Sequence, residues 1–299
     1  MMEEKEPQIT HNPILQRYYA AWESRLGYRL VMGGTRHFGY HPIGTTWPLP
    51  LGAALRRMED HLYHLLELPT GSKVLDAGCG NGHVALQLAR KGLRVQGIDI
   101  VANHIRWARQ EIKAQKMENM VSARVADYHH LDWVSDMSFD GVCTMETFVH
   151  AREPEQVLSE FFRILKPGGS IAMHEYWHLD DQELPPGTPK DLSDSIKRVD
   201  RESAMPTDRR LRRGVLQQML KDQGFVDVVE KDLSRNIAPT LLLFYVLGYI
   251  PYLIICFFGL QAWFVNTEAG VQGYRGLQRH LWGYSAVKAK KPLKTTGDS

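Results

Sequence analysis

Short apolar runs alternate with helical patterns along most of the chain. Turn residues follow each run, and then come apolar positions spaced three and four residues apart, which is typical of an amphipathic helix. Strands that alternate with helices favour a parallel sheet covered by helices on both faces. The runs that predict the first five strands lie within 73–89, 94–100, 124–133, 138–151 and 161–177.

The last third of the chain contains a long apolar interruption. A helix, a glycine cap and a sixth strand are predicted within 211–234, and a seventh strand within 281–292. Between them, 237–267 has no charged residue and meets the length and composition criterion for a membrane-spanning helix. Gly248 and Pro251 lie at its centre, and proline removes a helical hydrogen bond. We therefore expect two half-helices that bend there.

These half-helices would form a lid over the site or dip into one leaflet of a membrane as a monotopic anchor. An ordinary buried helical hairpin is the alternative. If the seventh strand returns to the same sheet, both flanks of the apolar segment lie on one side of any membrane. That arrangement excludes a simple single span.

The turn after the first strand predicts a ligand site. The first strand ends in Asp76, and Gly78, Gly80 and Gly82 follow before the next helix begins. Glycines in this place let the backbone approach a ligand closely. An aspartate repels phosphate but can hold an ammonium or a hydroxyl group. The pattern therefore predicts a nucleoside with a cationic tail and not a pyrophosphate.

Further acids follow the next strands. Asp99 ends the second strand, roughly 20 residues after the glycine turn, where such folds place an acid on ribose hydroxyls. Asp127 ends the third strand and could accept a hydrogen bond from an adenine amino group. Because the carboxyl ends of the strands meet at one edge of a parallel sheet, these acids are expected to converge on one crevice.

The motifs VLDAGCGNG, GIDI, FDGV and RILKPGG, in that order, resemble those of the class I S-adenosylmethionine-dependent methyltransferases. RMEDHLYHLLEL, METFVHAREPEQVLSEFFRILKPGG and HFGYHP (His37 to Pro42) resemble the sterol methyltransferase-like branch. The resemblance covers 36–177. It implies a Rossmann-like α/β fold, a sheet of seven mostly parallel strands with a helical, apolar cap, S-adenosylmethionine as methyl donor, and a lipophilic acceptor.

The resemblance also implies a set of donor-binding residues. Cys79 could equally be a small packing residue, Asp127 a surface turn residue, and Asp76 a support for the loop. Met145 could belong to the core. The expected set is Asp76, Gly78, Cys79, Gly80, Gly82, Asp99, Ile100, Ala126, Asp127, Tyr128 and Met145.

Glu146 and His150 follow the fourth strand, where the transferred methyl group would emerge. Burial beside an oily substrate would raise the pKa of the glutamate and lower that of the histidine, which suits proton acceptance near neutral pH. They are the candidate catalytic residues, although a solvated pair would be unremarkable. The candidate acceptor-binding residues are His37, Tyr40, His41, Tyr176 and Trp177; the first three could instead cap an entry helix.

Charge and composition limit the kinds of partner that are expected. The net charge of +2 gives no strong basic field, so a nucleic-acid substrate is not expected. His129 and His130 are expected to be loop residues, and three cysteines show no metal or disulfide spacing. The acidic, polar N-terminus is not a secretory signal, which favours a cytoplasmic protein with peripheral or monotopic membrane contact through 237–267. Its oligomeric state is left open.

We divide the chain into an entry segment, a donor-binding core, a connection with the sixth strand, an apolar lid, and a last strand with a basic tail. These span 1–60, 61–180, 181–236, 237–267 and 268–299.

The predicted activity is methyl transfer to a hydrophobic specialised metabolite: a terpenoid, polyketide, modified peptide or quinone. The arrangement resembles that of fungal secondary-metabolite methyltransferases. N- or O-methylation is preferred because the aromatic segments of the sterol enzymes are incomplete here. Two alternatives stay open: a sterol or quinone C-methyltransferase, and a non-catalytic donor-binding regulator or membrane scaffold.

Overall fold

A seven-stranded sheet forms the centre of the computed structural model, which describes residues 9, 12–206 and 210–293. The strand order is β3-β2-β1-β4-β5-β7-β6. β7 runs antiparallel to both of its neighbours, and the other pairings are parallel, which confirms the predicted sheet. The strands are β1 (Lys73–Ala77), β2 (Arg94–Asp99), β3 (Val121–Val125), β4 (Phe139–Met145), β5 (Leu165–His178), β6 (Val226–Asp232) and β7 (Trp282–Lys290).

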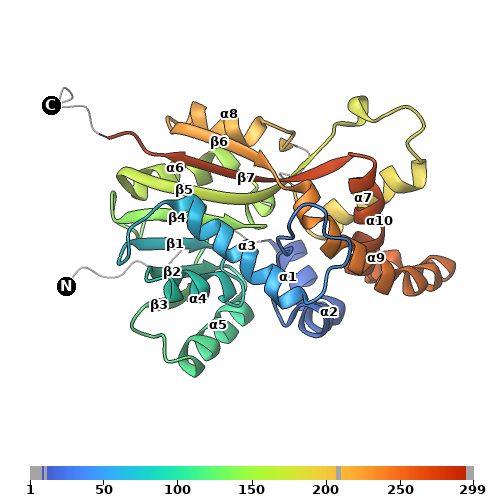
Figure 1. Cartoon of the computed structure of the whole chain (residues 1–299), viewed down its shortest axis with the longest axis horizontal. Helices are drawn as coiled ribbons and strands as arrows, with labels where there is room; N and C mark the ends of the chain where they lie inside the picture. The colour runs from blue at the N-terminus through green and yellow to red at the C-terminus, as the bar shows by residue number, and fades with distance from the viewer. Residues whose placement is uncertain (1–8, 10–11, 207–209, 294–299) are drawn as a thin grey trace.

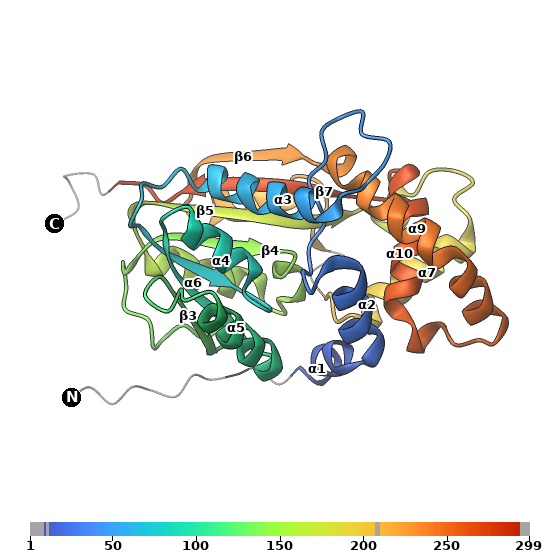
Figure 2. The same cartoon turned by 60° about the horizontal axis from the view of Figure 1, so that its bottom comes forward.

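Helices cover both faces of the sheet because successive side chains of a strand point to opposite sides, and both sides of the central strands are apolar. Val74 belongs to one buried cluster and its neighbour Leu75 to the other. The first cluster includes side chains of α3, α4 and α5, and the second those of α6 and α8 (Figures 1 and 2). These helices are α3 (Leu51–Leu66), α4 (His83–Arg90), α5 (Ala102–Ala114), α6 (Pro154–Ile164) and α8 (Val215–Asp222).

A second group of helices forms a cap beyond the carboxyl ends of the parallel strands (Figures 1 and 2). The first of them begins where the Asn12 side chain accepts a hydrogen bond from the Leu15 amide at 3.1 Å, with Pro13 in its first turn. The cap helices are α1 (Pro13–Ala20), α2 (Trp22–Met32), α7 (Lys190–Glu202), α9 (Ser234–Phe257) and α10 (Val265–Gln278). Short 3-10 turns are η1 (Phe148–His150), η2 (Asp181–Glu183) and η4 (Gln261–Trp263).

Most of the apolar segment lies in one continuous helix, α9, of 24 residues, and its last part runs through η4 into the start of α10. The expected break into two half-helices at Gly248 and Pro251 is therefore wrong. A proline removes only one helical hydrogen bond, and packing against α10 supports the helix at this point. A Cβ on Gly248 would lie 3.2 Å from the Val271 side chain of α10, so the two helices approach closely there.

α9 and α10 pack against each other, and the chain then returns to the sheet as β7, between β5 and β6. Both flanks of the apolar segment therefore join the same sheet, as expected. α9 is long and apolar enough to cross a membrane by length and composition, but the same property is found in core helices of soluble proteins. In its most apolar window only 17% of the residues are buried.

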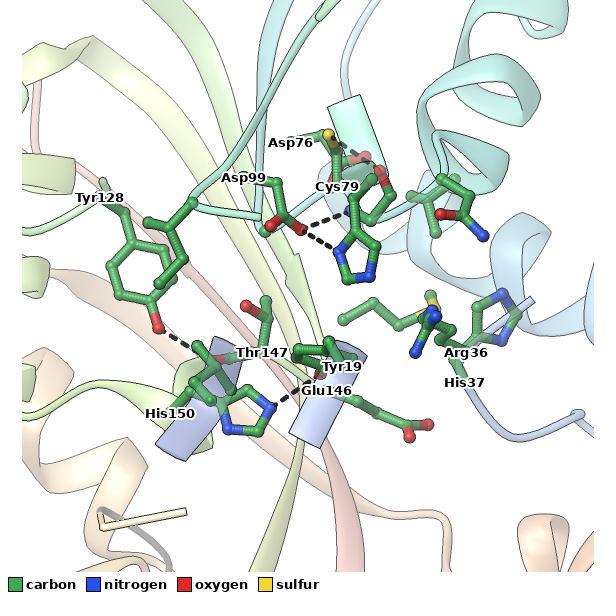
Figure 3. Close-up of a pocket in the computed structure, with 18 of the residues that line it drawn as sticks. Tyr19, Arg36, His37, Asp76, Cys79, Asp99, Tyr128, Glu146, Thr147 and His150 are labelled. Carbon is green, nitrogen blue, oxygen red and sulfur yellow. Dashed lines mark hydrogen bonds and ion pairs between the residues drawn. The ribbon is translucent and has the colours of Figure 1, made fainter. Parts of the chain in front are cut away.

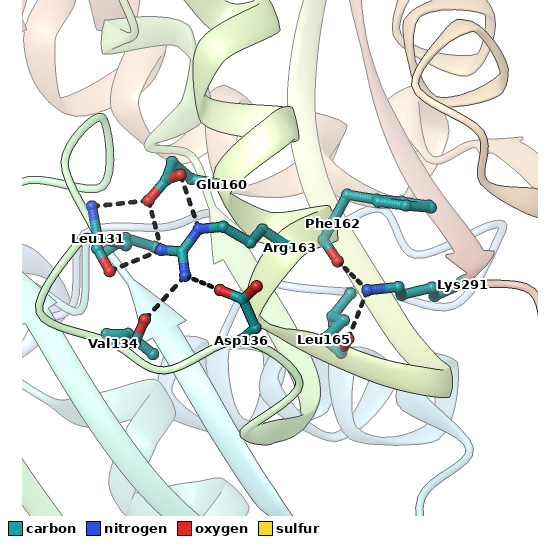
Figure 4. Close-up of polar contacts among 8 residues, drawn as sticks. All are labelled: Leu131, Val134, Asp136, Glu160, Phe162, Arg163, Leu165 and Lys291. Atoms are coloured by element: carbon teal, nitrogen blue, oxygen red, sulfur yellow. Dashed lines mark hydrogen bonds and ion pairs between the residues drawn. The ribbon is translucent and has the colours of Figure 1, made fainter. Parts of the chain in front are cut away.

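Arg163 near the end of α6 fastens the loop that joins β3 to β4 (Figure 4). Its guanidinium donates to the carbonyl oxygens of Leu131 and Val134 at 2.7 and 2.8 Å. It also pairs with the carboxylates of Glu160 and Asp136, at 2.7 and 2.6 Å. The loop that follows β3 is thereby held against the sheet, beside the carboxyl ends of the strands.

Candidate functional site

A cavity opens at the carboxyl ends of β1, β2 and β4, where the strand order reverses, as expected for a switch point in an open α/β sheet (Figure 3). Of the expected donor-binding residues, only Gly82 does not line it. Gly82 precedes α4, and a Cβ there would lie 3.2 Å from Ala108 of α5, so this glycine serves helix packing. Those that line the cavity are Asp76, Gly78, Cys79, Gly80, Asp99, Ile100, Ala126, Asp127, Tyr128 and Met145.

The glycine turn requires its glycines. Gly78 has φ +85°, and a Cβ on it would lie 2.0 Å from the Thr147 hydroxyl oxygen. Gly80 has φ +52° and open space where its Cβ would be. The amides of Gly78 and Cys79 both donate to the Ile98 carbonyl, at 2.8 and 2.9 Å, which fixes the turn against β2. The backbone can therefore approach a ligand closely at Gly80.

Asp76 supplies a buried acceptor without a donor. Its side chain lies at the end of β1 and is 2% exposed, and its Oδ2 has no hydrogen-bond partner. Burial raises the pKa of Asp76 to about 7, and the nearby charge of Asp99 adds to the effect. A cationic group in the cavity would satisfy Oδ2 and favour the ionised carboxylate. The residue thus fits an ammonium ligand.

Asp99 is ionised and rigidly held. Its Oδ2 accepts from the Gly80 amide at 3.0 Å and lies 3.3 Å from Nδ1 of His104, while Oδ1 accepts from the Val101 amide at 2.7 Å. Burial alone would raise the pKa of Asp99, but His104 and the two amides outweigh it and hold the pKa below the ordinary value. A fixed carboxylate at the end of β2 is suited to binding hydroxyl groups.

Asp127 lies in the loop two residues after β3, not at the end of the strand as expected. It is buried, and its Oδ1 accepts from the His129 amide at 2.9 Å and lies 2.6 Å from His129 Nδ1. His129 is therefore more than a loop residue, because it orients this carboxylate. The loop carries Asp127 and Tyr128 into the cavity wall together.

A second, larger cavity of about 370 Å³ adjoins the first. Its wall comes from α1, α2, α7, α9, α10, the end of β5 and the start of β7, and most of its side chains are apolar or aromatic, among them Phe38, Tyr176, Phe244 and Trp282. Four residues line both cavities and thus mark their junction: Tyr19, Arg36, Glu146 and His150.

Glu146 at this junction accepts three hydrogen bonds. They come from the Phe38 amide at 2.8 Å, from the Tyr284 hydroxyl at 2.8 Å and from the Tyr176 hydroxyl. Burial raises the pKa of Glu146, as expected. Its φ of +56° is unusual for a residue with a side chain and turns the carboxylate toward these donors. The carboxylate therefore joins the segment before α3 to β5 and β7.

His150 has both ring nitrogens engaged. Nδ1 lies 2.9 Å from the Ala204 carbonyl and donates to it, so Nε2, at 3.1 Å, accepts from the Tyr19 hydroxyl. Burial lowers the pKa of His150, as expected, and keeps the ring neutral. Sequence reasoning identified His150 but missed Tyr19 and Arg36, because no motif marks residues that only the folding of α1 and α2 brings to the site.

The expected acceptor-binding residues separate into two groups. Tyr176 lines the second cavity and His37 the first. The remaining three, Tyr40, His41 and Trp177, line neither cavity.

Each of these three residues has another partner. Tyr40 stacks on the ring of His61, and His41 Nε2 lies 2.9 Å from the Thr240 hydroxyl of α9. Trp177 packs against Gly283 on the opposite face of β5 from Tyr176, because neighbouring side chains of a strand alternate between faces.

Comparison with known proteins places this site in a family context. Residues 68–224 match the family described as "Methyltransferase domain". The chain is 40% identical, over 93% of its length and 94% of the relative's, to "S-adenosyl-L-methionine-dependent Diels-Alderase iccD" of Talaromyces variabilis. It is 29% identical to a sterol 24-C-methyltransferase of Yarrowia lipolytica, over 71% of this chain and 53% of that one. The solved structure of the [4+2]-cyclase SpnF shares its fold, with a TM-score of 0.72 at 23% identity over 96% of this chain and 99% of that one.

Proposed function

Because the chain belongs to the S-adenosylmethionine-dependent methyltransferase family, we propose that the first cavity holds S-adenosylmethionine and the second a lipophilic metabolite. In this proposal Asp76 faces the ammonium group, Asp99 the ribose hydroxyls and Asp127 the adenine amino group. The donor-free Oδ2 of Asp76 and the open space at Gly80 support the assignment. The mostly apolar wall of the second cavity supports the choice of substrate class.

The proposed reaction is an intramolecular [4+2] cycloaddition of a polyene, in which S-adenosylmethionine keeps its methyl group. Two carbon–carbon σ bonds form at the expense of two π bonds, so no proton, leaving group or oxidant is required. The observation that carries this proposal is the hydrogen bonding of Glu146 and His150, at the junction of the two cavities. Both carboxylate oxygens of Glu146 and Nε2 of His150 already accept hydrogen bonds from the protein, so a substrate proton would have to compete with these donors.

The relative named as a Diels-Alderase supports the same reaction, because its similarity extends over the cap as well as the core. The expected preference for N- or O-methylation receives less support, since such transfers need a base for the acceptor proton.

The chain would promote cycloaddition by shaping its substrate. A mostly apolar cavity favours a folded conformer of a polyene and thus lowers the entropic part of the barrier. Phe38 contacts the ring of Tyr176 edge-on at 6.0 Å, which gives one wall a fixed aromatic surface. When bound, S-adenosylmethionine supplies a positive charge that stabilises negative charge developing on a carbonyl group of the substrate.

Methyl transfer to a lipophilic small molecule is the second candidate, and the similarity to the sterol methyltransferase favours it. Transfer to an alkene carbon would create a cation, which the aromatic wall could stabilise. A non-catalytic donor-binding role has no observation in its favour.

One experiment separates the candidates. The purified protein is incubated with methyl-labelled S-adenosylmethionine and a lipid extract of the source organism, and products are followed by mass spectrometry. We expect a consumed compound to be replaced by an isomer of the same mass, with all label remaining in the donor. A labelled product, heavier by one CH2 unit, would overturn the cycloaddition and establish methyl transfer. Donor binding without any new product from a complete extract would leave the non-catalytic role.

We also propose that the cap contacts a membrane surface. Among the described side chains of α1, α2, α9 and α10, the acids Glu23 and Glu268 are buried, whereas Arg17, Arg29 and Arg235 are exposed. This charge distribution is complementary to anionic lipid headgroups. The same cap exposes apolar residues of α2, α9 and the turn after α9: Trp22, Leu26, Leu30, Leu247, Ile250, Ile254, Phe257, Phe258 and Trp263.

A further inference from the structure

Arg36 lies at the junction of the two cavities without the partner that its charge requires. The central carbon of its guanidinium lies over the rings of both Tyr19 and Tyr28, 4.9 and 4.8 Å from their centroids (Figure 3 shows Arg36 and Tyr19). Nε and Nη1 are buried, and neither has a hydrogen-bond acceptor among the described residues. The nearby carboxylate of Glu146 is occupied by its three other donors.

Two buried guanidinium nitrogens without an acceptor are costly. Arginine stays charged at all physiological pH values, and buried N–H groups are almost always paired. The faces of the two tyrosine rings attract the cation, but the N–H groups point outward in the plane of the guanidinium. They need an oxygen atom there. The cavity side of Arg36 is therefore built for an oxyanion.

We propose that Arg36 binds the carboxylate of the amino-acid end of S-adenosylmethionine, and that this contact couples donor binding to the cap. The inference rests on the proposed use of the first cavity. The amino-acid end is a zwitterion and needs one anionic and one cationic partner. Asp76 offers an acceptor without a donor and Arg36 offers donors without an acceptor, and both line the same cavity.

The coupling follows from the neighbours of Arg36. Tyr19 belongs to α1 and Tyr28 to α2, and both helices contribute to the wall of the second cavity. Tyr19 also donates to His150 Nε2 at 3.1 Å, which ties α1 to the loop after β4. A carboxylate that fixes Arg36 fixes the two rings that enclose it. Donor binding would thus complete the second cavity before the substrate enters.

Decarboxylated S-adenosylmethionine tests the proposal, because it lacks only the carboxylate. Both donors are titrated calorimetrically into the wild-type protein and into Arg36→Met, which keeps a side chain of similar length without charge. The wild type should bind S-adenosylmethionine about 10- to 100-fold more tightly than the decarboxylated compound, as expected for hydrogen bonds between charged groups. Arg36→Met should bind the two equally, and Arg17→Met on exposed α1 should keep the wild-type ratio.

Equal binding of both donors by the wild type, or a ratio that persists in Arg36→Met, overturns the proposal. If Arg36→Met does not fold, Arg36→Lys, which keeps the charge but loses the planar fork, should show an intermediate ratio. Hydrogen exchange supplies the readout for the cap: S-adenosylmethionine should slow exchange in 13–32 more than the decarboxylated donor does, and equal protection rules out the coupling. A protein that binds neither donor would instead contradict the proposed use of the first cavity.

Discussion

Asp76 is the residue whose ionisation should control donor binding. In the donor-free protein, burial raises its pKa to about 7. An ammonium ligand binds the ionised carboxylate, so the affinity for S-adenosylhomocysteine should fall about tenfold per pH unit below this pKa. Calorimetric titrations between pH 5.5 and 8.5 measure the profile. Asp76→Asn should bind more weakly and show no such slope, whereas Asp140→Asn, which lies outside the cavity, should keep the wild-type profile.

The raised pKa of Asp76 also affects the stability of the donor-free fold, which should decrease with rising pH, whereas donor affinity should increase. Because the pKa is raised above its ordinary value of 3.8, the folded state binds the proton more strongly than the unfolded chain. This stabilisation is complete below the unfolded pKa and is lost as the pH rises through about 7. Asp76→Asn should therefore be more stable than the wild type above pH 7 in thermal unfolding. A variant less stable at every pH would contradict a strained carboxylate.

The site residues that could be predicted from the sequence are positioned by the sheet, whereas those that were missed are positioned by the packing of helices. Asp76 and Asp99 follow strands whose apolar patterns are clear, so the parallel sheet alone brings them together. Tyr19 and Arg36 reach the junction only because α1 and α2 pack over the sheet edge. Such packing between distant segments cannot be predicted from a local sequence pattern. For Trp177 the missing information was the strand's phase, since one position along β5 changes the face.

At the scale of elements, Arg163 should contribute strongly to the stability of the fold. Arg163→Met removes the donors to two loop carbonyls and the ion-pair partner of Asp136 and Glu160, of which Glu160 still accepts from the Leu131 amide (Figure 4). We expect the free energy of unfolding in urea to fall by about 2 kcal/mol, as is usual when partly buried groups lose a charged hydrogen-bond donor. Arg201→Met, which removes an exposed ion pair with its neighbour Glu202, should cost less than about 0.5 kcal/mol. Equal losses for the two variants would show that Arg163 acts only as a surface charge.

The strands were predictable as elements because their apolar runs and turns are local signals, and the β7 return to the sheet followed from the same pattern. The continuity of α9 was not predictable from such local signals. From the sequence alone, Pro251 was expected to interrupt the helix. In the structure α10 packs closely against α9 at Gly248, and the helix is continuous. β3 shows a smaller error of the same kind: it ends at Val125, and Asp127 extends from a loop that Arg163 supports.

For the whole molecule, the cap combines an exposed apolar surface with the entrance to the second cavity. Val31 of α2 and Leu247 of α9 line that cavity and are 38% and 55% exposed. Trp22 of α2 contacts Phe264, the residue before α10, edge-on at 5.7 Å. A lipophilic substrate dissolved in a membrane could therefore enter between α2 and α9 without crossing water.

Vesicle flotation tests this route. The protein should float with vesicles of phosphatidylcholine and phosphatidylserine and less with phosphatidylcholine alone, because the exposed charges on α1, α2 and α9 are basic. Phe257→Glu, at a position 83% exposed, should reduce flotation at least tenfold, since it removes apolar area and adds a negative charge. Leu293→Glu, at a position 74% exposed and far from the cap, should float like the wild type. If Phe257→Glu instead converts a dimer to a monomer in size-exclusion chromatography and leaves flotation unchanged, the surface joins two copies of the chain and the membrane route is wrong.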